Sequence, residues 1–129
     1  MTNVTEIFKC QVCNNMVEMV RTGEGELYCC GKPMIHLNAN TDDSASTEKH
    51  VPVFENGKIK VGAVLHPMSQ EHHIEFIEAI SPDKKYIVRK FLKPNEEPIM
   101  DTSYNYCADN FIMREYCNLH GVWSAEKKY

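Results

Sequence analysis

The stretch Arg114-Glu115-Tyr116-Cys117-Asn118-Leu119-His120-Gly121 lies near the C-terminal end of the chain, and the rest of the sequence is organised around it. It places the thiol of Cys117 three residues before the imidazole of His120. A tight turn between them would let both side chains bind one metal ion. Asn118 and Gly121 are residues that turns favour. The stretch alone proves little, but it predicts two ligands of a metal site.

Further candidate ligands precede this stretch, in a region otherwise patterned as β-strands: His50, His66 and His72. Pro67 follows His66 and favours a turn or an extended loop over a helix, so the two histidines that flank this loop can converge on one ion. A lone histidine is more often a surface or hydrogen-bonded residue, and the hypothesis therefore depends on the whole set. His36 and His73 are interpreted as non-ligands, since His73 should point to the opposite side of a strand from His72.

The chemistry of this donor set favours iron. Four neutral imidazoles and one thiolate would leave a ferrous ion with a net charge of about +1, which suits a small anion as the target. Zinc seldom takes five such ligands, whereas iron accepts them and can change its oxidation state. The set therefore predicts inner-sphere reduction of a small oxygen species.

Length and cysteine distribution indicate two parts. A chain of 129 residues can form one ordinary domain, or a small module joined to a domain of about 90 residues. Four of the six cysteines lie in the first thirty residues, which favours a separate metal module. In a secreted protein these cysteines would suggest disulfides, but in a reducing compartment the same spacing indicates metal ligation.

Charge and hydropathy exclude some classes of partner. The net charge of -4 is spread along the chain, so no region has the positive field that nucleic-acid binding needs. No run of eighteen apolar residues is present, and residues 1–9 do not resemble a secretion signal. We therefore expect a cytoplasmic protein that binds neither nucleic acid nor membrane.

The first 37 residues are expected to form a metal-closed hairpin module. Cys10-Gln-Val-Cys13 is a knuckle whose backbone amides can point at the sulfurs, and the adjacent Cys29 and Cys30 supply the second pair. Residues 16–20 and 27–28 are predicted to be the two strands of the hairpin. A segment this short buries too little apolar surface to fold without the metal. Adjacent cysteines strain a regular zinc tetrahedron, so we favour iron, with structural zinc or free thiols as the alternatives.

Residues 38–48 are polar and are predicted to be a surface linker, and residues 49–129 a β-sandwich, so that the whole chain is all-β. Asn56-Gly57 is a strong hairpin signal, and residues 58–65 should place Ile59, Val61, Ala63 and Leu65 on one face. The other strands are expected at residues 51–54, 74–80, 86–92, 99–102 and 111–117.

Two resemblances cover nearly the whole chain. Cys10-Gln-Val-Cys13 with Cys29-Cys30-Gly31 resembles the desulforedoxin module, in which four thiolates hold one iron; Asn14 stands where that module commonly has Gly. The second region resembles desulfoferrodoxin, the two-iron form of superoxide reductase. The motifs that carry this resemblance are Glu48-Lys49-His50-Val51-Pro52, Gly62-Ala63-Val64-Leu65-His66-Pro67-Met68, His72-His73-Ile74-Glu75-Phe76-Ile77-Glu78, Lys90-Phe91-Leu92-Lys93-Pro94 and the opening stretch.

The resemblance implies an immunoglobulin-like sandwich with His50, His66, His72 and His120 around the second iron and Cys117 axial to it. It implies reduction of superoxide to hydrogen peroxide, with Lys49 attracting the anion and Glu48 occupying the sixth iron position after oxidation. Without it, Glu48 and Lys49 would be interpreted as solvated linker charges. It also implies rubredoxin or a similar carrier as electron donor, and a homodimer formed through the first domain.

Three other functions stay open at this point. The chain could be a structural zinc protein whose sandwich binds partners, or an electron carrier in which neither iron meets a substrate. It could also dismutate superoxide, although strong thiolate donation makes oxidation of superoxide less favourable. Cys107 matches no ligand position and is interpreted as a buried or free thiol. Trp123 is interpreted as a core residue or a domain contact.

Overall fold

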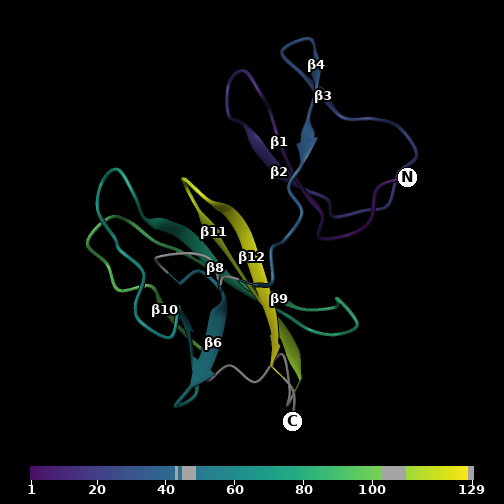
Figure 1. Ribbon diagram of the computed structural model, residues 1–129. Coiled ribbons are helices and arrows are strands. Elements are labelled where there is room, and N and C mark those ends of the chain that lie inside the picture. Colours follow the sequence, from purple (N-terminus) through teal and green to yellow (C-terminus); the bar gives the residue numbers. More distant parts are fainter. Residues whose placement is uncertain (43, 45–48, 103–109, 128–129) are drawn as a thin grey trace. The chain divides into compact units, whose positions relative to one another are not determined.

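The computed structural model describes residues 1–42, 44, 49–102 and 110–127. The chain divides into two compact units, Met1–Asn38 and Ala39–Tyr129. Regular structure in the described residues consists of strands, without a helix, which confirms the all-β prediction (Figure 1). Within the same residues, no helix is long and apolar enough to cross a membrane.

The first unit contains two small antiparallel sheets. In one, β1 (Ile7–Lys9) lies between β2 (Met16–Glu18) and β5 (Ile35–His36). In the other, β3 (Tyr28–Cys29) pairs with β4 (Lys32–Pro33). The predicted hairpin between residues 16–20 and 27–28 is therefore wrong, because β2 pairs with β1 and β3 pairs with β4.

The cysteine knuckle explains the observed pairing. The amide of Cys10 donates to the carbonyl of Asn15 over 2.8 Å, so the chain reverses direction between β1 and β2. Only the knuckle separates these two strands, and closing so short a loop costs less entropy than closing the longer one before β3. Few apolar side chains are buried here, chiefly Ile7 and Cys10 at 2% and 1% exposure.

The second unit is built from two antiparallel sheets. The four-stranded sheet has the order β12-β11-β8-β9, and the three-stranded sheet the order β10-β7-β6. The strands of the first sheet are β8 (Ile74–Ile80), β9 (Ile87–Phe91), β11 (Phe111–Cys117) and β12 (Gly121–Lys127), and those of the second are β6 (Pro52–Glu55), β7 (Lys58–Val61) and β10 (Ile99–Asp101).

One hydrophobic cluster joins the two sheets. It takes side chains from both of them, and Leu92 from just after β9: Ile59, Val61, Ile74, Ile77, Ala79, Leu92, Met100, Phe111, Met113 and Cys117. The predicted sandwich is thus confirmed, and the candidate ligand Cys117 belongs to its core. A thiol that is 0% exposed and packed in this way has little freedom to move.

The strand that follows the Asn56-Gly57 turn ends earlier than expected. The turn itself is confirmed, since both residues have positive φ, 54° and 74°, and Glu55 pairs with Lys58 across it. β7 stops at Val61, and Gly62 has a φ of 86°, so the chain leaves the sheet. Ala63 and Leu65 are exposed, so the prediction that they share one strand face with Ile59 and Val61 is wrong.

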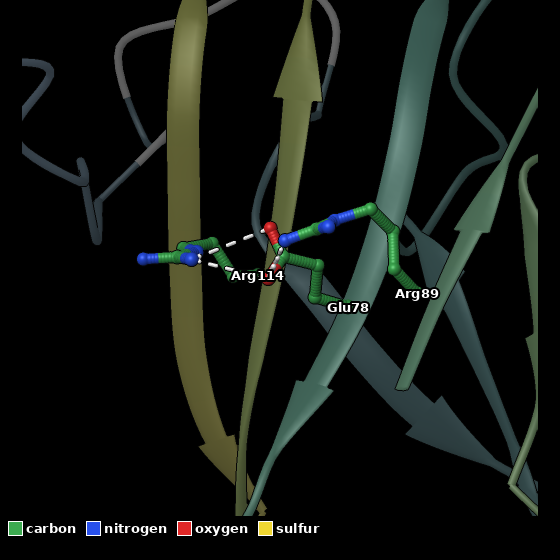
Figure 2. A network of polar contacts seen from close by, with 3 residues as sticks. All are labelled: Glu78, Arg89 and Arg114. Carbon is green, nitrogen blue, oxygen red and sulfur yellow. Dashed lines mark hydrogen bonds and ion pairs between the residues drawn. The ribbon is translucent and has the colours of Figure 1, made fainter. Parts of the chain in front are cut away.

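A buried ion network ties three strands of the larger sheet together (Figure 2). Glu78 on β8 is 0% exposed and lies between two arginines. Arg114 on β11 and Arg89 on β9 each donate to Oε2 of Glu78 over 3.1 Å. The guanidinium of Arg89 also lies over the ring of Phe76, 5.4 Å from its centre. A fully buried carboxylate is stable only with such partners.

Part of the predicted linker belongs to the second unit, where Asn40 pairs with β12. The amide of Asn40 donates to the carbonyl of Val122 over 2.8 Å, and the Ser124 amide donates to the carbonyl of Asn40 over 2.9 Å. The domain limits at residues 37 and 48 stay a prediction.

Candidate metal centres

The structure brings the four N-terminal cysteines together. The sulfurs of Cys10, Cys13, Cys29 and Cys30 all lie within 4.8 Å of one another. The Sγ atoms of Cys13 and Cys29 are 3.6 Å apart, and those of Cys29 and Cys30 are 3.9 Å apart. None of the five described cysteines forms a disulfide. Four thiols at one point are a typical site for zinc or for a single iron.

Backbone geometry aims these sulfurs at one point. The amides of Val12 and Cys13 donate to the sulfur of Cys10 over 3.3 and 3.4 Å, as predicted for a knuckle. Asn14 has a φ of 66°, a left-handed conformation that glycine adopts easily and asparagine tolerates. Cys30 and Gly31 follow with φ of 54° and 74°. This left-handed turn lets two adjacent cysteines face the same site.

The first cluster is prepared to lose protons to a metal. Hydrogen bonds from the backbone of Cys13 and Val12 lower the pKa of Cys10 to about 6. The pKa of Cys29 is raised to about 12, chiefly by the hydrogen bond between its side chain and that of Cys10. One thiol therefore ionises readily, and the next is opposed by the charge already present. A bound cation removes that opposition, because metal ligation releases the remaining protons.

A second cluster forms at one end of the sandwich. Ligand atoms of His50, His66, His72 and Cys117 lie within 4.8 Å of one another. His120 completes the set, since its Nδ1 is 3.1 Å from Nε2 of His50 and 3.8 Å from Sγ of Cys117. The structure thus brings together all five residues that the sequence analysis selected for this site.

The four imidazoles surround a common point. The ring centres of His50 and His66 are 4.7 Å apart, and those of His50 and His120 are 4.8 Å apart. His72 lies 4.6 Å from His66 and 5.0 Å from His120 by the same measure. Neighbouring rings are steeply inclined, with interplanar angles from 58° to 83°. Imidazoles arranged in this way can direct their nitrogen atoms toward the common point.

These distances fit one metal ion. Bonds of about 2.1 Å to nitrogen and about 2.3 Å to sulfur place donors on opposite sides of one ion about 4.4 Å apart. The sulfur of Cys117 is 3.6 Å from Nε2 of His66. Nδ1 of His66 lies 2.7 Å from the carbonyl of Pro67, which favours a proton on Nδ1 and leaves Nε2 as the donor to a metal. A set of imidazoles with one thiolate suits iron.

Strand ends position these ligands. Cys117 ends β11, and a three-residue turn leads to Gly121, which pairs with Cys117 at the start of β12. The ladder between β8 and β11 shifts register between Tyr116 and Cys117, so that Cys117 pairs with Ile74. Such bulges are frequent next to active sites, where they redirect a side chain.

Sequence reasoning missed two supports of the second cluster. Trp123 on β12 stacks on His50 with ring centres 4.7 Å apart and an angle of 14°, and its Nε1 donates to the carbonyl of His120 over 3.1 Å. The strand β12 was not predicted either. The apolar pair Val122-Trp123, directly after the turn that ends at Gly121, was the available signal. The second support is the side chain of Asn118, which contacts the backbone on both sides of His72.

A buried carboxyl lies two residues before Cys117. Glu115 is 0% exposed, and neither carboxyl oxygen has a hydrogen-bond partner within the described residues. Burial therefore raises its pKa well above the usual value. It pairs with Ile77 and Trp123 on the neighbouring strands.

Lys49 directly precedes His50 and is half-buried. Its backbone lies against Gly62, where an added Cβ would be 2.7 Å from the carbonyl oxygen of Lys49 and would also collide with that of Val64. Only glycine fits this close approach at a φ of 86°. Glu48 and Cys107, which the sequence analysis discussed, lie outside the described residues.

Fold and sites together define an all-β metalloprotein with one four-cysteine centre and one centre of histidines and a thiolate. The chain belongs to the desulfoferrodoxin family, because the family described as "Desulfoferrodoxin" matches residues 41–126 and the "Desulfoferrodoxin, N-terminal domain" matches residues 2–37. The observed clusters match the Fe(Cys)4 and Fe(His)4(Cys) centres of this family.

Relatives of similar length support the same assignment. The chain is 48% identical to desulfoferrodoxin of Nitratidesulfovibrio vulgaris, over 98% of this chain and 99% of that one. It is 46% identical to desulfoferrodoxin of Syntrophotalea carbinolica over the same shares. Among solved structures, the superoxide reductase of Treponema pallidum matches with a TM-score of 0.69 and 26% identity, over 93% of this chain and 96% of that one.

Proposed function

We propose that this chain is a superoxide reductase that converts superoxide to hydrogen peroxide at the second centre. The observation that carries this proposal is that four imidazoles and one thiolate meet at one end of the sandwich. One of these ligands, His50, directly follows Lys49 in the sequence. The name of the Treponema pallidum structure, which covers nearly the whole chain, supports the same activity.

We assign the ligands of the two iron ions as follows. Cys10, Cys13, Cys29 and Cys30 would hold the first iron. His50, His66, His72, His120 and Cys117 would hold the second. His50 and His66 are 1% and 3% exposed, whereas His120 is exposed, so the second site faces solvent on its His120 side.

The reaction needs one electron and two protons for each superoxide, and it yields one hydrogen peroxide. An iron ion held by the four histidines and Cys117 would supply this electron. The protein supplies the frame: buried His50, His66 and Cys117 fix the donor positions before any substrate arrives. Such preorganisation limits the rearrangement that electron transfer requires.

Lys49 is proposed to attract the anionic substrate. The chain has a net charge of -4, so attraction must be local rather than global. The backbone of Lys49 is fixed against Gly62, in the turn that leads to His66. Its ammonium carries three N–H donors, which can bind superoxide oxygen and order a water that delivers protons. The role expected of Glu48, as a carboxylate that caps the oxidised metal, stays a prediction.

A small one-electron carrier of the rubredoxin type is proposed to restore the reduced state. Each turnover removes one electron, and only an outside donor can return it. We also propose a cytoplasmic location, where reduced thiols persist, and a homodimer formed through the first unit. Exposed apolar side chains on that unit, such as Tyr28 at 61% and Ile35 at 49%, are consistent with a covered face.

Pulse radiolysis of the ferrous protein tests the proposed reaction. Superoxide generated in less than stoichiometric amount should oxidise the second centre in a fast second-order step, with one peroxide formed per iron oxidised. Lys49→Ala should slow this step by about tenfold and weaken its dependence on ionic strength. Lys58→Ala removes the same charge from an exposed position on β7 and should leave the rate unchanged.

Other outcomes would identify the alternatives. A rate that falls equally in Lys49→Ala and Lys58→Ala would contradict local steering. Consumption of superoxide by the ferric protein, with release of dioxygen, would indicate dismutation. No reaction with superoxide at all would leave an electron carrier or a structural metal protein.

A further inference from the structure

The side chain of Asn118 holds both peptide groups that flank His72. The amide of His73 donates to Oδ1 of Asn118 over 2.9 Å, and Nδ2 of Asn118 donates to the carbonyl of Glu71 over 3.0 Å. The backbone amide of Asn118 also donates to the carbonyl of His73 over 3.1 Å. The orientation of the side-chain amide follows from its partners, because an N–H needs an acceptor and a carbonyl needs a donor.

This contact replaces strand pairing at the point where the strands stop. β8 begins at Ile74 and β11 ends at Cys117, after the shift in register described above. Beyond that pair the residue before β8 is His73 and the residue after β11 is Asn118. A side-chain amide carries a carbonyl acceptor and an NH2 donor group, so it can pair as a peptide group does. Asn118 therefore extends the pairing to residues 71–73 after the ladder has ended.

We propose that Asn118 is a positioning residue that fixes His72 relative to Cys117. This inference rests on the ligand set assigned above, in which both residues bind the second iron. His72 lies on the loop that follows His66, and within that loop its amide donates to the hydroxyl of Ser69 over 3.1 Å. Ser69 shapes the loop locally. Asn118 joins the loop to the hairpin that carries Cys117 and His120.

The chemistry of the side chain is specific for asparagine. Alanine removes both side-chain contacts. Aspartate keeps an acceptor for the His73 amide but places a second oxygen against the carbonyl of Glu71, which has no proton to give. The Asn118→Asp variant is therefore expected to bind iron no better than Asn118→Ala. Residues that orient metal ligands typically change metal affinity by about 10-fold to 100-fold when replaced.

The test is competition for iron between the loaded protein and a chelator, followed separately at each centre by its thiolate-to-iron absorption band. Asn118→Ala and Asn118→Asp should each weaken the affinity of the second centre by about tenfold or more, and shift its band and its reduction potential. The four-cysteine centre serves as an internal reference and should be unchanged.

Asn40→Ala is the matched control. Its side-chain amide also donates to a backbone carbonyl of the second unit, that of Val122, over 3.2 Å. This variant should lower thermal stability without changing the second-centre band. Wild-type affinity and spectrum in Asn118→Ala would overturn the inference, as would full recovery by Asn118→Asp. Because no superoxide is used, failure of the proposed role of Asn118 and failure of the proposed superoxide reaction are separate results.

Discussion

The two metal sites differ in what surrounds them. The four cysteines of the first unit sit on short strands and turns, with Cys13 and Cys30 exposed to solvent and few apolar side chains buried nearby. Cys117 of the second unit is 0% exposed and belongs to a ten-residue hydrophobic cluster shared by two sheets. The first site therefore has few buried side chains around it, whereas the second lies at the end of a packed sandwich.

This difference indicates that the fold of the first unit depends on its metal, whereas the metal site of the second unit depends on its fold. In the first unit the metal must supply folding free energy, because a segment of this size cannot bury enough surface alone. In the second unit His50, His66 and Cys117 are buried and Cys117 is packed in the core, so we expect the sandwich to hold them in place without the metal. A site built in this way can change oxidation state without losing its structure, and that is what a reductase needs.

Metal removal should have the largest effect and should separate the two units. After iron is removed by a chelator under reducing conditions, the amides of β1, β2 and β5 should exchange with solvent freely. Amides of β8 and β11 should stay protected, because packing and the Glu78 network hold them. Hydrogen exchange followed by mass spectrometry measures both. Equal loss of protection in β8 and β11 would show that the second fold also depends on its metal.

Glu78→Gln should break the second unit without touching its ligands. It leaves Arg114, whose side chain is 11% exposed, without its buried carboxylate partner. Loss of one member of a buried pair costs about 3–5 kcal/mol of unfolding free energy. Denaturant unfolding measures this cost. Glu55→Gln is the matched control. The side chain of Glu55 is 56% exposed and pairs with Lys60, so this substitution should cost less than about 1 kcal/mol. Similar costs for both would refute the role of burial.

Trp123→Phe should give the smallest change. Phenylalanine keeps an aromatic ring against His50 but loses the hydrogen bond from Nε1 to the carbonyl of His120. We expect a loss of about 1 kcal/mol in stability, together with a shift in the second-centre absorption band. The band of the four-cysteine centre should not move. A stability loss without any spectral shift would reduce Trp123 to a core residue.

Much of the second unit could be predicted from local pattern. Strands were predicted at residues 74–80 and 111–117 between turn-favouring residues, and β8 and β11 have these bounds; Asn56-Gly57 marks the turn before β7. The five donors of the second site could be named from the sequence because histidine and cysteine are common metal ligands. Their convergence followed from motifs compared with a family, and spacing alone would not have given it.

The supports of that site could not be predicted, because they depend on contacts between distant residues. Asn118 matched a turn signal, and nothing in the sequence indicates that its amide reaches Glu71 and His73. Trp123 meets His50 only after β12 pairs with β11. In the first unit, strand pairing was mispredicted since the knuckle, rather than the later turn, brings the strands together. The extra length predicted for β7 ignored Gly62, whose positive φ ends the strand.

The most direct test of where superoxide reacts is pulse radiolysis of two ferrous variants, Cys13→Ser and Cys117→Ser, against wild type. We assign superoxide chemistry to the second centre alone. Cys13→Ser should therefore lose the four-cysteine spectrum and still react with superoxide at the wild-type rate. Cys117→Ser should keep that spectrum and lose the fast reaction. A fast reaction that survives in Cys117→Ser, or that disappears in Cys13→Ser, would contradict this assignment.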